Sequence, residues 1–417
     1  MVRVAAGNFL EAYDFQVFGY YATAIGLTFF PASDPYASLL ASFATFGAGF
    51  LMRPLGAIVL GAYVDHRGRR AGLLLTLGLM AIGTLSIACT PGYARIGLLA
   101  PLLVLLGRLL QGLSAGVELG GVSVYLFEIA PPARRGFFVS WQSATQQLAV
   151  VFAALLGLFL TANISATNMT RWGWRIPLLT GCLMIPFLLR LRRSLDETDA
   201  FRSRTHHPTM PGVARIVAAQ WRLVLLGMML ATMVTVSFYT ITAYTPTFGS
   251  AVLHLSNTAS LSVTLCVGIS NFVWVPVAGA LSDRIGRRAL LFGCTILTLL
   301  TAYPALAWLV SSPSFSKLLA VELWLSLMFG GYSGALVVFM TEMMPVAART
   351  AAFSLAFALA TAIFGGFTPA VCTFLIHLTG NRAMPGVWLS VAAACGLFAA
   401  IRLSPARLLV RESAAAV

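Results

Sequence analysis

Long apolar stretches, separated by short polar segments, follow one another along the whole chain. Four of them contain no Asp, Glu, Lys or Arg: residues 71–94, 137–170, 223–282 and 289–316. A helix needs about 20 apolar residues to cross the hydrocarbon core of a bilayer, and unpaired backbone groups are costly in lipid. The apolar residues do not alternate with polar ones, as they do in membrane-spanning strands. The pattern therefore predicts an all-α membrane protein.

Polar turn signals divide the apolar stretches into twelve expected helices. Examples are "PASDP" at 31–35 and "SSPS" at 311–314. The expected helices cover residues 5–30, 37–63, 71–91, 97–127, 137–162, 172–190, 223–248, 257–281, 289–310, 316–343, 351–377 and 384–403. An even number of spans places both termini on the same side of the membrane.

Composition and charge agree with this class of protein. Hydrophobic residues make up 59% of the chain and charged residues 10%, which excludes a soluble globular domain. The net charge of +14 would suit a nucleic-acid partner, but the cations lie in short loops, where the positive-inside rule accounts for them. Twenty cations lie on the side of the termini and five on the other side. We therefore expect cytoplasmic termini, a bacterial inner-membrane location, the lipid bilayer as a partner and no nucleic acid.

One long polar segment interrupts the series of apolar stretches. It predicts an N-terminal six-helix bundle at 1–191, a cytoplasmic linker at 192–222 and a C-terminal six-helix bundle with a short tail at 223–417. The linker contains His206 and His207, which we interpret as a solvated pair rather than a metal site. All six cysteines lie inside apolar stretches and no C-x-x-C occurs, so we expect neither a metal site nor a cofactor.

Two charged motifs each occur twice, once in each half of the chain. "GAYVDHRGRR" at 61–70 returns as "GALSDRIGRR" at 279–288, and "FEIAPPARRG" at 127–136 returns as "TEMMPVAART" at 341–350. Repeated halves in a helical membrane protein imply two similar bundles around a central site. The expected fold is therefore twelve transmembrane helices in two pseudo-symmetric six-helix bundles.

The repeated charges predict a cytoplasmic gate that holds one face shut and breaks when that face opens. Exposed ion pairs are weak singly, but a network of them biases two states that differ by a few kcal/mol. We expect Glu128 to pair with Arg135, and Glu342 with Arg349. The alternative is that the basic loops only fix the orientation. The candidate gate residues are Asp65, Arg69, Glu128, Arg135, Asp283, Arg287, Glu342 and Arg349.

The two G-x-x-x-D-x-x-G-R-R motifs, the linker between six-helix halves and "GRLLQG" at 107–112 resemble the major facilitator superfamily. "GNFLEAYDF" at 7–15 narrows the resemblance to the metabolite–proton symporters, and "SWQSATQQ" and "FGGFTP" are similar to citrate–proton symporters and tricarballylate transporters. His66 departs from the family, which usually has Arg or Lys there. The resemblance implies proton-coupled import of citrate or a related tricarboxylate by alternating access. Alternatives are 2-oxoglutarate, another dicarboxylate, or proline and betaine.

Ionisable residues inside a membrane are expensive and usually functional. Asp14, Arg53 and Glu118 each fall about ten residues from a cytoplasmic helix end, or roughly 15 Å deep at ~1.5 Å per residue. Glu322 falls close to the outer surface, where we expect it to be solvated. Proton coupling needs a carboxyl group whose proton affinity changes with its surroundings. The candidates are Asp14, our first choice, and Glu11 and Glu118.

An anionic substrate needs positive charge at its site, and arginine can hold a carboxylate with two hydrogen bonds. Arg53 and Arg108 are the arginines expected inside the membrane, and the resemblance associates Arg108 with proton coupling. For Arg53, a structural ion pair with Asp14 or Glu11 is an alternative of nearly equal weight. The other candidate substrate-binding residues are neutral hydrogen-bonding side chains: Tyr21, Gln146, Gln147, Tyr239 and Asn271.

Other classes of protein fit the sequence less well. No arrangement of residues suggests catalysis, so we do not expect an enzyme, and no nucleotide motif suggests ATP as an energy source. Duplicated halves with matched charged motifs argue against a passive channel or a receptor. The expected partners are a small-molecule polycarboxylate and protons. We expect a monomer, because the two halves already enclose the path.

Overall fold

The computed structural model describes residues 2–67, 69–116, 118–193, 218–344 and 349–403, and for a few of these only the backbone. Every element among them is helical. The α-helices are α1 (Val2–Tyr20), α2 (Ala22–Phe29), α3 (Pro35–Arg67), α4 (Arg69–Cys89), α5 (Tyr93–Ile96), α6 (Leu99–Ala115), α7 (Glu118–Ile129), α8 (Arg135–Asn163), α9 (Ala166–Asn168), α10 (Arg175–Arg193), α13 (Trp221–Tyr239), α14 (Thr245–Thr247), α15 (Asn257–Ile285), α16 (Arg287–Ser311), α17 (Phe315–Met343), α18 (Arg349–Ala360), α19 (Thr368–Thr379) and α20 (Met384–Arg402).

The helices group into the twelve predicted spans. Eight helical stretches of the described chain are long and apolar enough to cross a membrane, and three shorter apolar helices lie in α4, α6 and α10. The one remaining span is the first span of the chain, which α1 and α2 form together. The prediction of a single continuous first helix is wrong in detail, because the helix breaks at Tyr21.

The seventh and eleventh spans depart from regular α-helix. The seventh contains two π-helical turns, η3 (Thr240–Tyr244) and η4 (Phe248–Val252), on either side of α14. The eleventh contains another, η6 (Thr361–Gly365), between α18 and α19. Such turns are rare and are frequent at functional sites.

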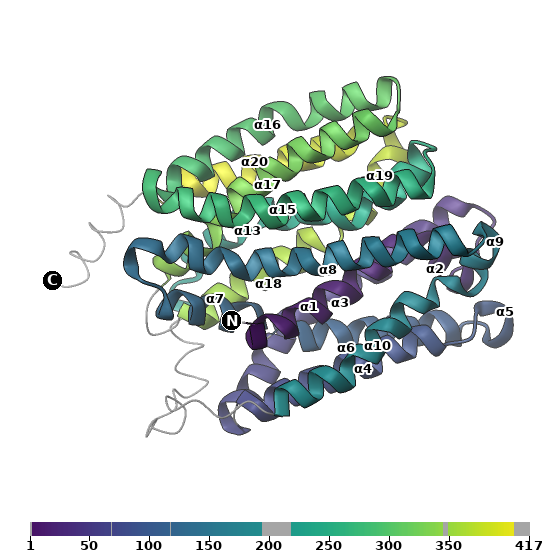
Figure 1. Cartoon of the computed structure of the whole chain (residues 1–417), viewed down its shortest axis with the longest axis horizontal. Coiled ribbons are helices and arrows are strands. Elements are labelled where there is room, and N and C mark those ends of the chain that lie inside the picture. The colour runs from purple at the N-terminus through teal and green to yellow at the C-terminus, as the bar shows by residue number, and fades with distance from the viewer. Residues whose placement is uncertain (1, 68, 117, 194–217, 345–348, 404–417) are drawn as a thin grey trace.

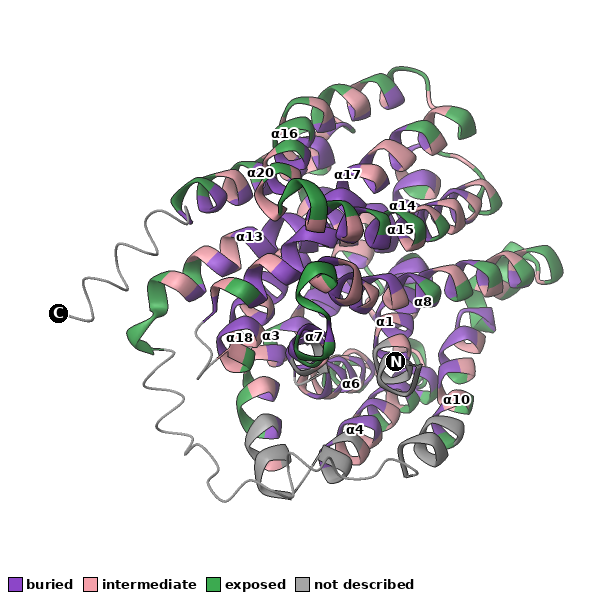
Figure 2. Ribbon diagram, turned by 60° about the vertical axis from the view of Figure 1, so that its left-hand side comes forward, coloured by how far each residue is buried: buried purple, intermediate pink, exposed green. Residues whose placement is uncertain are grey.

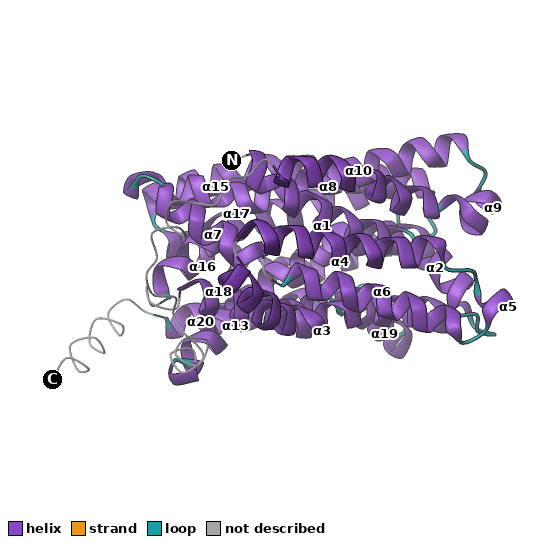
Figure 3. Cartoon of the chain, turned by 90° about the horizontal axis from the view of Figure 1, so that it is seen from below, coloured by secondary structure: helices purple, strands orange, loops and turns teal. Residues whose placement is uncertain are grey.

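The spans run side by side along the long axis of the molecule (Figures 1 and 3). In Figure 1 the helices of the first six spans lie mainly in the lower part and those of the last six mainly in the upper part. The loop between α15 and α16, which holds the second charged motif, lies at the left, at the same end as the start of α1. We call this the hinge end and the opposite end, with α5 and α9, the far end.

Large apolar side chains cover the outside of the bundle, where Figure 2 shows exposed and partly exposed positions along the outer helices. Leu183, Leu300 and Phe159 are 78%, 64% and 63% exposed. A soluble monomer rarely exposes apolar surface on this scale, whereas a membrane covers it with lipid. Polar side chains lie inside instead, and many serines and threonines donate to a carbonyl one turn earlier, as Thr264 does to Ser260.

Close backbone contacts at glycines hold equivalent pairs of spans together in the two halves. A Cβ atom on Gly116 would lie 2.2 Å from the carbonyl oxygen of Arg53, where α6 meets α3. A Cβ on Gly334 would lie 2.5 Å from the carbonyl oxygen of Val275, where α17 meets α15. Glycines therefore allow the same kind of contact in both halves of the chain.

We expect Gly112→Ala to prevent normal folding, because a Cβ there would lie 1.6 Å from the carbonyl oxygen of Gly49. Overpacking costs about 1–3 kcal/mol where side chains can adjust, and more against a backbone. Gly293→Ala is the matched control, since its Cβ would meet nothing within 4 Å. Thermal stability in detergent measures both. Equal melting temperatures for the two variants would contradict the packing.

Candidate functional site

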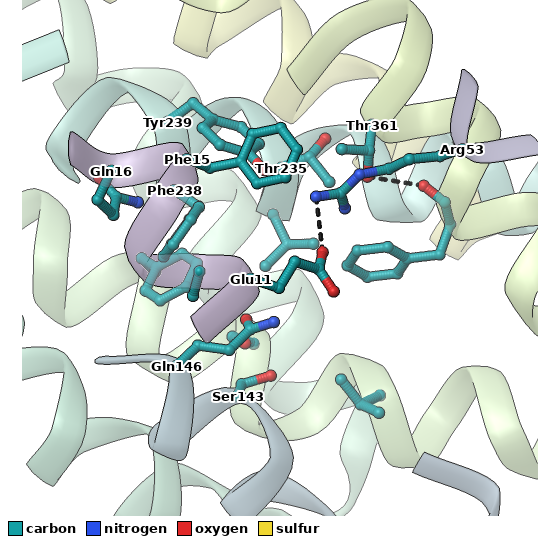
Figure 4. Close-up of a pocket in the computed structure, with 16 residues that line it drawn as sticks. Glu11, Phe15, Gln16, Arg53, Ser143, Gln146, Thr235, Phe238, Tyr239 and Thr361 are labelled. Atoms are coloured by element: carbon teal, nitrogen blue, oxygen red, sulfur yellow. Dashed lines mark hydrogen bonds and ion pairs between the residues drawn. The ribbon is translucent and has the colours of Figure 1, made fainter. Parts of the chain in front are cut away.

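A cavity lies between the two halves of the molecule, on the hinge-end side of the breaks in the first and seventh spans (Figure 4). Residues of α1, α3 and α8 form one wall, and residues of α13, α17 and α18 form the other. Phenyl rings supply much of the apolar lining. The polar side chains that line it are Glu11, Gln16, Arg53, Ser143, Gln146, Thr235, Tyr239, Ser333 and Thr361. Four of the predicted site residues are among them: Glu11, Arg53, Gln146 and Tyr239.

Arg53 is the cationic side chain of the described cavity wall. Its Nη2 atom lies 2.8 Å from Oε1 of Glu11, and the two side chains are only 9% and 6% exposed (Figure 4). The guanidinium also lies 4.5 Å from the centre of the Phe50 ring and 4.8 Å from that of Phe15. The ion pair that we weighed as an alternative is therefore present, and it faces the cavity rather than the protein interior.

Arg108 lies behind this wall and is completely buried. Its guanidinium lies 4.3, 4.5 and 5.0 Å from the ring centres of Phe15, Phe18 and Phe46. Aromatic faces attract a desolvated cation, so these rings stabilise the charge inside the membrane. Phe15 separates Arg108 from the cavity in part, because the same ring lines the cavity.

A chain of buried hydrogen bonds joins Arg108 to Asp14. Nη1 of Arg108 donates to Oε1 of Gln111 at 2.8 Å, and Nε2 of Gln111 donates to Oγ1 of Thr84 at 2.8 Å. The Thr84 hydroxyl donates to Oδ2 of Asp14 at 2.5 Å. All four side chains are at most 1% exposed. Asp14 is therefore connected to Arg108 by hydrogen bonds through two neutral side chains, Thr84 and Gln111.

Gln147 and Asn271, both predicted to bind substrate, contact each other outside the cavity lining. Nδ2 of Asn271 donates to Oε1 of Gln147 at 3.1 Å, and Oγ of Ser326 donates to Oδ1 of Asn271 at 2.7 Å. Both residues are completely buried between α8 and α15. Tyr21 also lies outside the lining, and its buried hydroxyl has no partner among the described residues. The structure therefore does not bring these three residues to the cavity.

Charged groups of both halves meet at the hinge end. The backbone N–H groups of Gly136 and Phe137, at the start of α8, donate to the two carboxylate oxygens of Asp283 at 2.9 and 3.0 Å. Arg287 lies 2.9 Å from Asp283 and 3.3 Å from Glu342. A negative charge at a helix N-terminus is favourable, so Asp283 joins α15 to α8 across the two halves.

The pairing of the other predicted gate residues differs from the prediction. Glu342 pairs with Arg287 rather than Arg349. Glu128 is exposed and has no ion pair with Arg135 in the described chain. The guanidiniums of Arg135 and Arg349 instead lie 4.3 and 5.1 Å from the ring of Phe127. The side chains of Asp65, Arg69 and Glu118 lie outside the described part of the structure.

A single family model matches most of the chain. The model described as Major Facilitator Superfamily covers residues 4–369. The chain belongs to the major facilitator superfamily. The superfamily's twelve-helix fold agrees with solved structures: the xylose transporter of E. coli in a partially occluded inward-open conformation has a TM-score of 0.76 and 19% identity, over 97% of each chain.

Two curated members of the superfamily are much closer to this chain in sequence. The citrate-proton symporter of Salmonella typhi is 57% identical over 97% of this chain and 93% of its own length. The citrate-proton symporter of Klebsiella pneumoniae is 57% identical over 96% of this chain and 90% of its own length. These similarities place the chain among multi-pass membrane transporters.

The prediction that Glu322 is solvated is wrong. We expected it to be solvated near the outer surface, but it is 2% exposed. Its Oε1 atom accepts a hydrogen bond from Thr245 of α14 at 2.9 Å, and Oε2 has no partner among the described residues. The sequence gives the depth of a residue along its helix, but not the face on which it lies, and α17 turns this face toward the seventh span.

Since no cation pairs with Glu322 in the described structure, we expect Glu322→Gln to retain both stability and transport. Glu322→Ala should lower stability by about 2–4 kcal/mol, because it leaves a void and removes the hydrogen bond from Thr245, whose hydroxyl keeps only the carbonyl oxygen of Thr240 as a partner among the described residues. Thermal unfolding and uptake assays on both variants make the comparison. A folded Gln variant without transport would instead place Glu322 on the proton path.

Sequence reasoning missed several polar residues that the structure brings to the site. Thr84 was not considered because it lies in an apolar stretch without charge, and a single threonine in a helix usually bonds to its own backbone. Ser143, Ser333 and Thr361, which line the cavity, were missed for a similar reason. Only the packing of the helices shows which hydroxyl groups face the cavity. The carboxylates of α1 were the signal that could have pointed to Thr84, since a buried carboxylate needs a hydrogen-bond donor from a neighbouring helix.

Proposed function

We propose that the protein is a proton-coupled symporter that imports citrate or a closely related tricarboxylate by alternating access. The observation that carries this proposal is the Arg53–Glu11 ion pair on the wall of a cavity between the two halves. A fixed guanidinium in a cavity of low polarity is suited to a carboxylate ligand. The similarity to curated citrate-proton symporters over nearly the whole chain supports the same substrate class. No arrangement of the described site residues suggests catalysis, and we propose no enzymatic activity.

The mechanism follows from competition for Arg53. A substrate carboxylate that binds Arg53 takes the place of Glu11, and Gln146, Tyr239 and the hydroxyls of the cavity wall hydrogen-bond the remaining polar atoms. Asp14, held on the other side of α1, carries the transported proton. Protonation of Asp14 removes one negative charge from the neighbourhood of Arg108 and Arg53 and so favours binding of an anion. Loading of the proton and loading of the substrate therefore support each other.

The domain division and the topology complete the proposal. Residues 1–191 and 223–417 act as two six-helix bundles joined by the cytoplasmic linker 192–222, most of which lies outside the described residues. The hinge end faces the cytoplasm, because most cations lie there, and the membrane is the inner membrane of a bacterium. A monomer suffices, because one chain supplies both walls of the cavity.

The contacts at the two ends of the bundle serve as alternating gates. Asp283 and Arg287 hold α15 against α8 at the hinge end. At the far end, the rings of Tyr36 and His377, one from each half, stack with centres 3.8 Å apart and planes within 12°. One gate opens while the other stays closed.

We expect Asp283→Asn to weaken the hinge-end gate and to reduce uptake by about tenfold or more, since a hydrogen-bonded charge pair contributes about 1.5–3 kcal/mol. The reaction rate of a cysteine placed in the cavity separates an effect on the gate from an effect on folding. A cysteine in place of Ser143, which lines the cavity, should react faster with a reagent added from the hinge side when Asp283→Asn is present. The parent protein without that cysteine is the control. An unchanged labelling rate with normal uptake would remove Asp283 from the gate.

Uptake of labelled citrate into proteoliposomes with an acid-outside gradient tests the proposed function. The competitors are unlabelled tricarballylate, 2-oxoglutarate and betaine. We expect gradient-driven uptake that tricarballylate blocks and betaine does not. Transport of 2-oxoglutarate or betaine in place of citrate would move the substrate to that class.

A further inference from the structure

The Thr84 hydroxyl lies at a branch point of the buried hydrogen-bond chain. It lies 2.5 Å from Oδ2 of Asp14, 2.8 Å from Nε2 of Gln111 and 3.0 Å from the carbonyl oxygen of Met80. A hydroxyl has one proton to donate and two lone pairs to accept with. The amide of Gln111 can only donate in this contact, and the Met80 carbonyl can only accept. The direction of the contact between Thr84 and Asp14 is therefore the one that is free to change.

This geometry satisfies both protonation states of Asp14 without moving a heavy atom. When Asp14 is ionised, Thr84 donates to Oδ2 and accepts from Gln111. When Asp14 is protonated on Oδ2, it donates to Thr84, and the Thr84 proton turns to the carbonyl of Met80. The two lone pairs of Thr84 then accept from Asp14 and Gln111. Every polar atom around the hydroxyl keeps a partner in both states.

Thr84 provides the one side-chain hydrogen bond that the described structure gives to the Asp14 carboxyl. The other oxygen, Oδ1, is buried and has no partner among the described residues. It faces Gly181 of α10, where an added Cβ would lie 2.9 Å away. A carboxylate buried in this way depends strongly on its remaining donor.

We propose that Thr84 is a positioning residue for proton coupling: its hydroxyl turns between Asp14 and Met80 as Asp14 loses or gains the transported proton. The proposal rests on the proposed function, because it takes Asp14 as the proton carrier. It adds a residue that contacts neither the substrate nor the cavity. Through Gln111 the same hydroxyl keeps its contact with Arg108 in both states.

Few other titratable groups face Asp14 from the helices packed around it. Arg108 of α6 interacts electrostatically with Asp14. Tyr13, next to Asp14 on α1, and Cys182 of α10 do so as well. Glu11, one turn earlier on α1, points to Arg53 of α3 on the cavity side. The described side chains of α4 and α8 near Asp14 contribute no charge. A change at Thr84 therefore acts on Asp14 without removing a charged neighbour.

Citrate counterflow at equal pH on both sides of the membrane tests the proposal, because exchange needs the protonated, loaded carrier and no net proton movement. We expect the rate for the wild type to fall as the pH rises and Asp14 loses its proton. Thr84→Val and Thr84→Ala remove the hydrogen bond to both forms of Asp14, and the bond to the ionised form is the stronger one, so the fall should shift to a pH about one unit higher. Thr84→Ser keeps the hydroxyl and should follow the wild type. Citrate has the same ionisation state for every variant at a given pH, so its own titration cancels when the variants are compared at equal pH.

Asp14→Asn separates a failure of this inference from a failure of the proposed function. If Asp14 carries the proton, its counterflow should no longer fall with pH over the same range. A wild-type profile for Asp14→Asn would overturn the proposed role of Asp14. A flat profile for Asp14→Asn, together with wild-type profiles for Thr84→Val and Thr84→Ala, would overturn the role of Thr84 alone. A shift in Thr84→Ser equal to that in the other two variants would also overturn it, because the hydroxyl would then not matter.

Discussion

Arg53→Gln should reduce citrate uptake by about 100-fold or more, because two charge-assisted hydrogen bonds to a carboxylate are lost and each contributes about 1.5–3 kcal/mol. The same change removes the cation that pairs with the buried Glu11, which costs about 3–5 kcal/mol of stability. Uptake by the single variant therefore mixes two effects. Arg53→Lys should fail as well, since an ammonium group does not reproduce the planar fork of arginine.

The double variant Glu11→Gln with Arg53→Gln separates binding from folding. It removes the ion pair without leaving a charge behind, so its melting temperature should return close to that of the wild type. Its citrate uptake should remain absent, and citrate should no longer protect it against thermal unfolding. Normal uptake by a stable double variant would show that Arg53 has only the structural role that we weighed from the sequence.

Asp14→Asn should abolish proton-driven accumulation. An amide cannot carry the proton, so an acid-outside gradient should no longer raise the internal citrate concentration above the external one. Exchange of internal for external citrate should persist, because the Arg53 site does not include Asp14. Labelled-citrate accumulation and counterflow in the same proteoliposomes measure the two processes. Accumulation against a gradient by Asp14→Asn would move the proton to Glu11 or Glu118.

The fold was predictable because its main signals are long and periodic. The backbone N–H and C=O groups of each uncharged stretch have to be paired in lipid, which requires a helix. The charged motif at 61–70 and 279–288 shows that the two halves of the chain repeat. The break at Tyr21 and the π-helical turns were not predictable, since they arise from contacts between spans rather than from local sequence.

The site was only partly predictable, because depth along a helix is easier to read than the direction of a side chain. Arg53, Glu11 and Gln146 do line the cavity. Asn271 and Gln147 were predicted to bind substrate, yet they hydrogen-bond each other between α15 and α8. Arg108 was predicted to be functional, but the three phenyl rings around it come from α1 and α3 and have no pattern of their own in the sequence.

The π-helical turn η3 has a consequence for the length of the seventh span. A π turn closes over one residue more than an α turn, so η3 accommodates one residue that a regular helix would not. Each residue corresponds to about 100° of rotation at 3.6 residues per turn. Loss of one residue within η3 would turn everything beyond it by that angle and carry Thr245 away from Glu322. The residue that η3 accommodates therefore sets the rotation of the next part of this span, and insertions or deletions there should change the far end of the bundle more than substitutions do.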